Sequence, residues 1–314
     1  MPTTFAAGPF RVRVPATSAN LGPGFDALGL ALALYDDVAA EVTTSGVTVS
    51  VVGEGAGDLP LDDGHLVVRA MRAAFDELGG QPRGLSVECV NRIPQARGLG
   101  SSSAAIVAGV LLARALVTDG TQRLDDDAAL RLAARIEGHP DNVAPCLLGG
   151  FTLAWTEPSG ARAVSLPVAD GVRPTVLVPT EHGLTASARA ALPPTVPHGD
   201  AALNAGRAAL LVHALTTRPD LLLPATVDRL HQGYRASSMP GTAAVVEALR
   251  AAGVPAVVSG AGPTALALSD LPEGFEAGTD WRILRLPVDV RGAQVGQGRL
   301  GHAERDPVAA GRKS

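Results

Sequence analysis

The sequence has few aromatic residues and almost no cysteine, and each shortage excludes a class of protein. Of its 314 residues 46% are hydrophobic but only 3% are aromatic, so the core must be built from Ala, Val and Leu. The two cysteines, Cys89 and Cys146, lie far apart and lack the Cys or His spacing of a metal site. They are typical of buried free thiols in a reducing cytosol, not of a disulfide framework.

A basic surface and a long apolar run are also missing. The formal net charge is −5, and no stretch combines Lys or Arg with interleaved aromatics, which argues against a nucleic-acid partner. The N-terminus has no basic region followed by an apolar run. The most apolar stretch, 104–117, is too short to span a bilayer. We therefore expect a cytoplasmic protein without nucleic-acid or membrane partners.

Hydrophobic periodicity predicts a mixture of strands and helices. Strands are expected at 10–14, 85–90, 150–156, 174–178, 255–259, 264–268 and 281–287, and a hairpin at 38–52 that turns near Ser45. Helices are expected at 65–78, 102–117, 125–137, 201–215, 220–232 and 241–252. Without a strict βαβ rhythm, this order favours the α+β class.

The length allows two domains, each with its own core. A region at 157–173 that is rich in turn residues is the best boundary, which gives domains at 1–160 and 161–300. The tail at 301–314 is polar and has few apolar residues, so we predict that it is disordered.

The strongest local motif is PQARGLGSSSA at 94–104, between an expected strand and a buried helix. Its glycines let the backbone approach a ligand. The free N–H groups of the helix start then form an anion site. The stretch is neither a Walker A loop nor a dinucleotide fingerprint, because the Lys-Ser/Thr pair and the third glycine are absent. It predicts a phosphate site, the alternative being an ordinary Gly-rich loop with a Ser cap.

Two further glycine motifs are less specific. TSANLGPGFD at 17–26 can present Asn20 and Asp26 to a ligand, or it can be a tight turn whose side chains bond their own backbone. SGAGPT at 259–264 can approach the phosphate loop from another domain, or it can be a plain hairpin.

Polar residues also gather at 137–145. His139 and Asp141 could form a metal pair or an acid–base relay, but a single histidine makes zinc a poor choice. A carboxylate here could complete a Mg²⁺ site beside nucleotide phosphates. Arg189 and Arg235 could each bind a carboxylate, although a surface arginine is the commoner case.

The three glycine motifs occur in the order found in the GHMP small-molecule kinases, and the sequence resembles that family from about residue 10 to about residue 290. GLGSSS followed by a helix resembles the whole family. The motifs at 17–26 and 138–145 resemble the branch that phosphorylates L-homoserine on its way to threonine.

The resemblance implies a two-domain α+β fold. The N-terminal, ATP-binding domain would be like domain 2 of ribosomal protein S5, and the C-terminal domain would be ferredoxin-like. It also implies ATP and L-homoserine as substrates, Mg²⁺ as cofactor and a homodimer.

The roles that the resemblance implies cover the whole expected site. The ATP phosphates would be held by Pro94, Gln95, Ala96, Arg97, Gly98, Leu99, Gly100, Ser101, Ser102, Ser103 and Ala104, with Mg²⁺ on Ser102 (or a neighbouring serine) and Glu137. The amino acid would be bound by Asn20, Asp26, His139, Asn142, Thr185, Arg189, Arg235, Gly260 and Gly262. Asn142 would receive the substrate hydroxyl. Since Asn is not a base, we expect the hydroxyl proton to leave with the phosphate unless Asp141 takes it.

Two other functions use the same residues. One is a GHMP kinase for mevalonate-like or sugar alcohols, which would not need both an ammonium acceptor at Asp26 and paired arginines. The other is a non-catalytic nucleotide or metabolite sensor, against which the serines at 101–103 and Glu137 argue.

Overall fold

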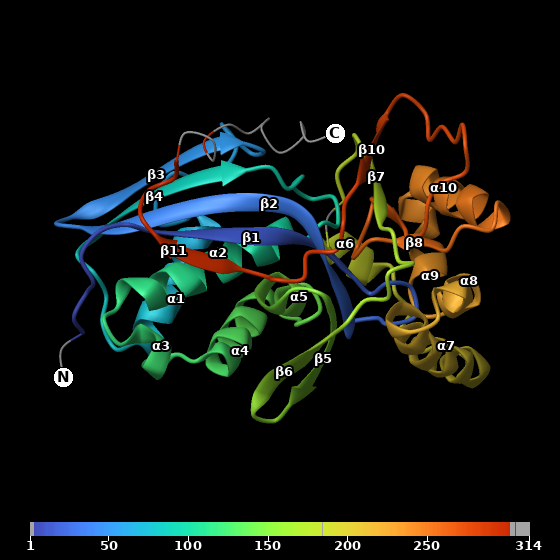
Figure 1. Cartoon of the computed structure of the whole chain (residues 1–314), viewed down its shortest axis with the longest axis horizontal. Coiled ribbons are helices and arrows are strands. Elements are labelled where there is room, and N and C mark those ends of the chain that lie inside the picture. The colour runs from blue at the N-terminus through green and yellow to red at the C-terminus, as the bar shows by residue number, and fades with distance from the viewer. Residues whose placement is uncertain (1–2, 184, 302–304, 306–314) are drawn as a thin grey trace.

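The computed structural model describes residues 3–183, 185–301 and 305, and its chain forms two sheets, each with its own helices (Figure 1). The larger sheet has the order β11-β1-β2-β4-β3, with β5 paired to β2 and β6 paired to β5. Its strands are β1 (Phe10–Ala19), β2 (Leu28–Thr43), β3 (Gly46–Gly53), β4 (Gly84–Asn91), β5 (Phe151–Glu157), β6 (Gly160–Leu166) and β11 (Gln294–Gln297).

Helices cover one face of this sheet (Figure 1). They are α1 (Leu66–Glu77), α2 (Ser101–Leu116), α3 (Gly120–Arg123), α4 (Asp126–Glu137) and α5 (Val143–Leu148). As its apolar sequence predicts, α2 is buried along most of its length. Gly109 allows α1 to pack closely on it, because a Cβ there would strike the Val67 carbonyl.

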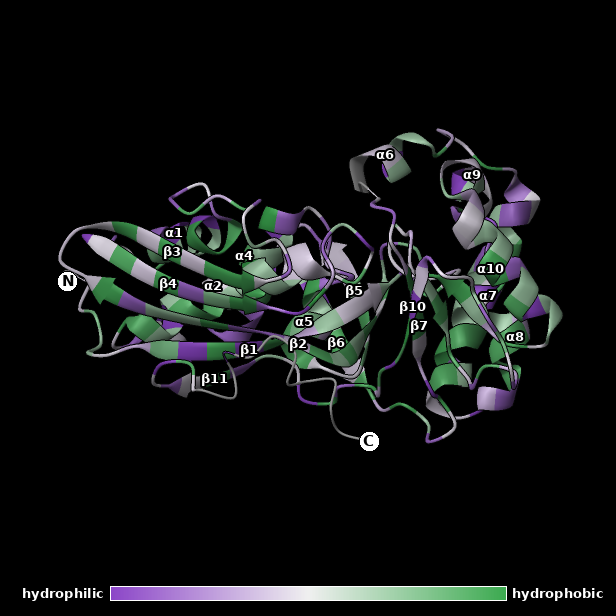
Figure 2. Ribbon diagram, turned by 90° about the horizontal axis from the view of Figure 1, so that it is seen from above, coloured by the Kyte–Doolittle hydropathy of each residue, from purple (hydrophilic) through white to green (hydrophobic). Residues whose placement is uncertain are grey.

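The smaller sheet has the antiparallel order β10-β7-β9-β8. Its strands are β7 (Thr175–Pro179), β8 (Ala256–Val258), β9 (Ala265–Ala267) and β10 (Trp281–Arg285). Its helices are α6 (Thr185–Ala190), α7 (His198–Thr216), α8 (Leu222–Ala225), α9 (Gln232–Arg235) and α10 (Pro240–Ala251), with 3-10 turns at Pro219–Leu221 and Ala236–Ser238. Figure 2 shows α6 and α9 next to one another at one end of this half of the molecule.

The hairpin predicted at 38–52 is wrong. Both of its strands exist, but β4 lies between them, antiparallel to β2 and parallel to β3. Alternating Val and Thr residues identify a strand without specifying its partner, and here the partner comes from a segment about forty residues later.

The helix predicted at 220–232 is also broken, into α8 and α9. The carboxylate of Asp228 accepts hydrogen bonds from the backbone N–H groups of Leu230, His231 and Gln232, and so starts a new helical turn. Strands β6 and β11 were not predicted. β6 begins at Gly160 and β11 at Gln294, and both belong to the larger sheet, while the domain boundary itself stays a prediction.

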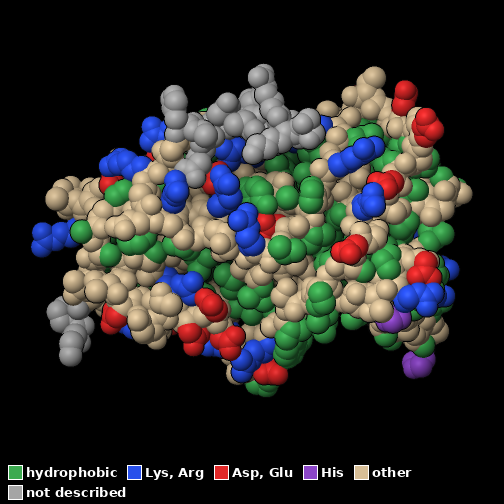
Figure 3. Space-filling model, viewed as in Figure 1, with side chains coloured by type: hydrophobic (Ala, Val, Ile, Leu, Met, Phe, Trp, Pro, Cys, Tyr) green, Lys and Arg blue, Asp and Glu red, His purple; other side chains and the backbone are tan. Residues whose placement is uncertain are grey.

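Both acidic and basic side chains are scattered over the face drawn in Figure 3. In the described part of the chain, no helix is both long and apolar enough to cross a membrane. The predicted disorder of residues 301–314 falls almost entirely outside the described residues.

Candidate active site

A cavity of about 360 Å³ lies where the predicted motifs meet. Residues 94–102 and Ala104 line it, with Glu137, His139, Asp141 and Asn142 from the segment after α4. Asn20, Asp26, Arg189, Arg235 and Gly260 also line it. The structure thus gathers residues that are up to 240 positions apart in the sequence.

The phosphate loop ends at the buried helix α2, as predicted. Its cap residue is Gly100, with φ +71°, and glycine has no side chain that could accept from the N–H groups of the first helical turn. The first N–H groups of a helix have no partner within the helix. In the part of the chain that the structure describes, no backbone N–H from 98 to 103 donates to a backbone carbonyl outside the helix. These amides are available to an anion.

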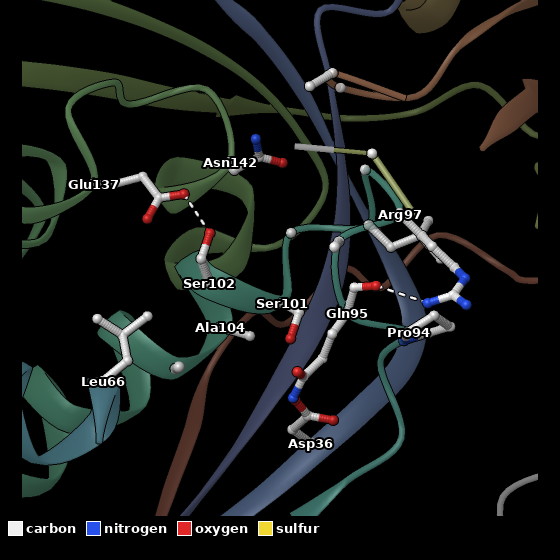
Figure 4. Close-up of a pocket in the computed structure, with 18 of the residues that line it drawn as sticks. Asp36, Leu66, Pro94, Gln95, Arg97, Ser101, Ser102, Ala104, Glu137 and Asn142 are labelled. Atoms are coloured by element: carbon white, nitrogen blue, oxygen red, sulfur yellow. Dashed lines mark hydrogen bonds between the residues drawn. The ribbon is translucent and has the colours of Figure 1, made fainter. Parts of the chain in front are cut away.

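Glu137, at the end of α4, points at the start of α2 (Figure 4). Its Oε1 accepts hydrogen bonds from Ser102 Oγ at 2.7 Å and from Ser103 Oγ at 2.9 Å. Helix α4 positions this carboxylate because Asp125 caps its first turn and Gly138, in the left-handed region, ends it. A carboxylate and a hydroxyl beside an amide-lined anion site are oxygen ligands that suit Mg²⁺.

Backbone strain is concentrated in the predicted binding motifs. Among the described residues, the non-glycine residues with positive φ are Asn20, Leu21, Asp26 and Ala96. The first three belong to the 17–26 motif and the last to the phosphate loop. Such conformations persist only where the surrounding structure fixes them, and they cluster at functional sites.

The motif at 17–26 is fixed from both halves of the molecule. The side-chain amide of Asn20 donates to the Gly260 carbonyl at 2.8 Å and accepts from the backbone N–H of Asp26 at 2.9 Å. His231 Nε2 lies 2.8 Å from the Gly22 carbonyl oxygen. The side chain of Asn20 therefore shapes the turn that presents Asp26 to the cavity.

The motif at 259–264 supports the phosphate loop from behind. Ser259 Oγ donates to the Gly98 carbonyl at 2.6 Å, and a Cβ added at Gly98 would strike the Ser259 carbonyl oxygen. Gly260 lines the cavity, whereas Gly262 packs against Met239 at the rear of the loop. The glycines of both motifs thus allow two backbones to touch.

Asp26 and Arg189 form a bidentate ion pair, with Nη2–Oδ1 at 2.6 Å and Nη1–Oδ2 at 2.9 Å. The hydrogen bonds that Arg189 donates to the Asp26 carboxylate raise the pKa of Arg189. Both side chains are partly exposed, at 42% for Arg189 and 36% for Asp26, so solvent screens the pair. A small ligand can reach these charges from the cavity.

Arg235, in contrast, is only 2% exposed. Its Nε donates to the Ala188 carbonyl at 2.9 Å, and its Nη1 lies 3.1 Å from His231 Nδ1. Burial lowers the pKa of its guanidinium, with the nearby Arg189 adding to this. A buried cation bordering a cavity favours an anionic ligand, because no carboxylate of the described residues pairs with it directly.

Phe25 lies beside both arginines. The guanidinium carbons of Arg189 and Arg235 are 5.6 and 5.3 Å from its ring centroid, which is within cation–π range. The sequence showed this aromatic residue only as part of a glycine turn. The ring, which the tertiary structure brings against both guanidiniums, holds the two cations at one end of the cavity.

His139 and Asp141 form a close pair, with Nδ1 and Oδ1 2.5 Å apart. This hydrogen bond raises the pKa of His139 above its ordinary value, against the opposing effect of burial. Asp141 is 2% exposed and is engaged by the imidazole. Asn142, the next residue, accepts a hydrogen bond at Oδ1 from Thr17 Oγ1 at 2.8 Å.

His65 is a residue of the cavity that the sequence did not single out. Its Nδ1 accepts from the Val67 backbone N–H and caps α1, so the neutral ring carries its proton on Nε2. Nε2 is buried and has no hydrogen-bond partner among the described residues. Burial also lowers the pKa of this histidine and keeps it neutral. His65 is recognised as a candidate ligand contact only from its unpaired Nε2–H donor in the folded protein.

Asp36 also lines the cavity. Its Oδ1 accepts from the backbone N–H groups of Arg92 and Ile93 at 2.6 and 2.9 Å. Burial nevertheless raises the pKa of this carboxyl to about 7. Thr185, another predicted substrate contact, begins α6, and its side chain lies outside the described residues.

Comparison with known proteins identifies the family. The model of the GHMP kinases N terminal domain matches residues 65–150, and that of the GHMP kinases C terminal domain matches residues 201–282. The chain belongs to the GHMP kinase family. The two-domain α+β fold expected from the sequence is therefore confirmed.

Full-length relatives agree with this. The GHMP kinase described here is 61% identical over 295 residues to a homoserine kinase of Streptomyces coelicolor, covering 93% of this chain and 96% of the relative. A homoserine kinase of Streptomyces avermitilis is equally similar, with 97% of its length covered. The crystal structure of homoserine kinase from Cytophaga hutchinsonii superposes with a TM-score of 0.78 at 28% identity, covering 94% of this chain and 99% of that one.

Proposed function

We propose that this GHMP kinase transfers the γ-phosphoryl group of ATP to the side-chain hydroxyl of L-homoserine, a step toward threonine. The observation that carries this proposal is that side chains of opposite charge line the same cavity. Asp26 can accept an ammonium group, while Arg189 and Arg235 can bind a carboxylate. An amino acid carries both groups, and the relatives named homoserine kinase support the choice.

In this proposal the phosphates lie on residues 94–104, at the positive end of the α2 dipole. Ser102 and Glu137 would hold Mg²⁺, whose charge would offset that of the phosphate oxygens. The hydroxyls of Ser102 and Ser103 already lie on Glu137, so the site needs little rearrangement. His65 Nε2–H would donate to a ring nitrogen of the adenine, because an orphaned buried donor is costly unless a ligand satisfies it.

The substrate would replace the Asp26–Arg189 pair with two pairs of its own. Its ammonium group would pair with Asp26, and its carboxylate would pair with Arg189 and with the buried Arg235. Each charge of the protein then has an opposite charge after binding, so little electrostatic energy is lost when the internal pair opens. Asn142 would hold the hydroxyl close to the phosphate loop.

The reaction then needs no protein base. The hydroxyl oxygen bonds to the γ-phosphorus, the bond from phosphorus to the β–γ bridging oxygen breaks, and ADP leaves with that electron pair. The hydroxyl proton passes to an oxygen of the transferred phosphate. Asp141 is buried and hydrogen-bonded to His139, so its role here is to orient the imidazole in the substrate pocket.

A coupled ADP-release assay tests the proposal. With Mg-ATP, L-homoserine should give ADP and O-phospho-L-homoserine in equal amounts. D-homoserine should fail because its ammonium and carboxylate are exchanged relative to the hydroxyl arm. L-serine should be poor because its hydroxyl is one methylene too short to reach the phosphate.

Competition against mevalonate separates homoserine from the other acceptors of the family. If mevalonate lowers the formation of O-phospho-L-homoserine while total ADP release becomes faster, mevalonate is itself phosphorylated, which would favour a kinase for mevalonate-like alcohols. ATP binding without ADP formation, across a panel of hydroxylated amino acids, would favour a sensor. The homodimer and the cytoplasmic location stay predictions.

A further inference from the structure

Thr17 is a buried polar residue that lies between the phosphate loop and Asn142. It lies near the end of β1 and is 0% exposed. Its Oγ1 is 2.8 Å from Asn142 Oδ1, across 125 residues of sequence. Its backbone N–H donates to the Leu99 carbonyl of the phosphate loop at 3.0 Å. Thr17 therefore touches both the phosphate loop and the residue assigned to the substrate hydroxyl.

The direction of this hydrogen bond fixes the amide of Asn142. A hydroxyl carries one proton, and Asn142 Oδ1 is the acceptor that it reaches. With the amide reversed, Nδ2 would donate to Oγ1, and the buried Thr17 hydroxyl proton would lose this acceptor, which is unfavourable for a buried donor. The amide is held with its oxygen on Thr17, which leaves Nδ2 as the donor available to the cavity.

We propose that Thr17 is a positioning residue that presents the Asn142 Nδ2–H group to the acceptor hydroxyl of the substrate. The inference rests on the proposed function. The hydroxyl oxygen of the substrate has two lone pairs and one proton. One lone pair accepts from Asn142, the other attacks the γ-phosphorus, and the proton faces a phosphate oxygen. Thr17 thereby selects the arrangement in which the proton leaves with the phosphate.

Gly100 connects this arrangement to the phosphate loop. A Cβ added at Gly100 would collide with Thr17 Oγ1 and would also lie 3.3 Å from Asn142 Oδ1. The left-handed φ of +71° independently favours glycine at this position. The start of α2 and the Thr17–Asn142 pair are thus packed directly against each other, which sets the distance between phosphate and acceptor.

The test compares Thr17→Val with Thr17→Ser by steady-state kinetics. Valine keeps the shape but loses the hydroxyl, and serine keeps the hydroxyl. Thr17→Val should lower kcat about 100-fold, because the Asn142 amide is then no longer oriented and the substrate hydroxyl, the nucleophile, is misplaced. The KM for ATP should not change, and Thr17→Ser should stay close to the wild type. Thr17→Ala serves as the second variant should valine prevent folding, with thermal melting as the check on each protein.

A double-mutant comparison separates positioning from a structural role. In an Asn142→Ala background, Thr17→Val should cause no further loss of kcat, since Thr17 acts through that amide. Multiplicative losses would overturn the inference, as would a fully active Thr17→Val protein. Wild-type protein that releases no ADP with L-homoserine would instead refute the proposed function itself, and this result does not depend on any Thr17 variant.

Discussion

The phosphate loop of the cavity is one continuous stretch, residues 94–104, whereas the acceptor end takes side chains from both halves of the molecule. The first uses backbone amides at a helix start, and the second uses the charged side chains of Asp26, Arg189 and Arg235. Backbone amides need only the right local conformation, which glycines encode nearby. Side chains of opposite charge that face one cavity require distant segments of the chain to pack together. The two ends should therefore respond differently to substitution.

Arg235→Met should have the largest effect and should be confined to the acceptor end. Loss of a buried cation facing the substrate carboxylate should weaken homoserine binding by on the order of 2–4 kcal/mol, while ATP binding changes little. Separate KM values for the two substrates measure this. Arg250→Met is a control, because Arg250 is a partly buried arginine that donates to Thr226 and Leu223 and lies outside the cavity. Equal losses for both substrates would place Arg235 outside the acceptor site.

Glu137→Gln tests the metal role at the phosphate end. Glutamine keeps an oxygen that accepts from Ser102 and Ser103 but removes the negative charge. Activity should fall by about 10- to 100-fold, and the Mg²⁺ concentration for half-maximal rate should rise. ADP release across a Mg²⁺ titration checks both. An unchanged Mg²⁺ requirement would remove Glu137 from the metal site.

His65→Ser tests whether His65 Nε2 donates a hydrogen bond to the adenine of ATP. Serine still caps α1 but is too short to reach the base, so it isolates the Nε2 donor. The KM for ATP should rise by about 5- to 10-fold, the equivalent of one hydrogen bond, while the KM for homoserine stays constant. His65→Leu, which also loses the cap, should melt at a lower temperature than His65→Ser. A KM for ATP that equals the wild type in His65→Ser would contradict the assignment.

Asp141→Asn should have a smaller effect, because asparagine still offers an oxygen to His139. Turnover should remain within about 10-fold of the wild type. A loss of this size is expected from a weaker hydrogen bond to His139, whereas removal of a catalytic base would cost more. Single-turnover kinetics at saturating substrates measure the chemical step. Complete loss of turnover, with intact homoserine binding and stability, would show that Asp141 takes the proton.

Asp36→Asn should alter stability and not catalysis. The pKa of Asp36 is raised from 3.8 to about 7, so the folded protein favours the protonated carboxyl. That contribution is complete below the unfolded pKa of 3.8 and is lost as pH rises through about 7. Asparagine cannot ionise, so the melting temperature of the variant should rise relative to the wild type between about pH 4 and about pH 8. A constant difference across this range would exclude Asp36 as the titrating group.

Prediction from sequence succeeded for elements and motifs whose signals are local. The buried helix α2 and the strand before the phosphate loop were expected, because their apolar runs and glycines are contiguous. The hairpin at 38–52 was wrong, since a strand pattern does not name its neighbour. Strand β11 was missed because its four residues gain their pairing only from β1.

The amino-acid sequence alone determined the family, the phosphate loop and the residue types of the acceptor end. Only the tertiary structure decided which side chains meet, such as Asp26 with Arg189 and Thr17 with Asn142. It also decided that His65 Nε2 is buried without a hydrogen-bond partner among the described residues. The physical reason is the range of the interactions. Helix starts and glycine turns depend on neighbours a few residues away, whereas ion pairs and buried donors depend on which distant segments pack together, and burial then sets their strength.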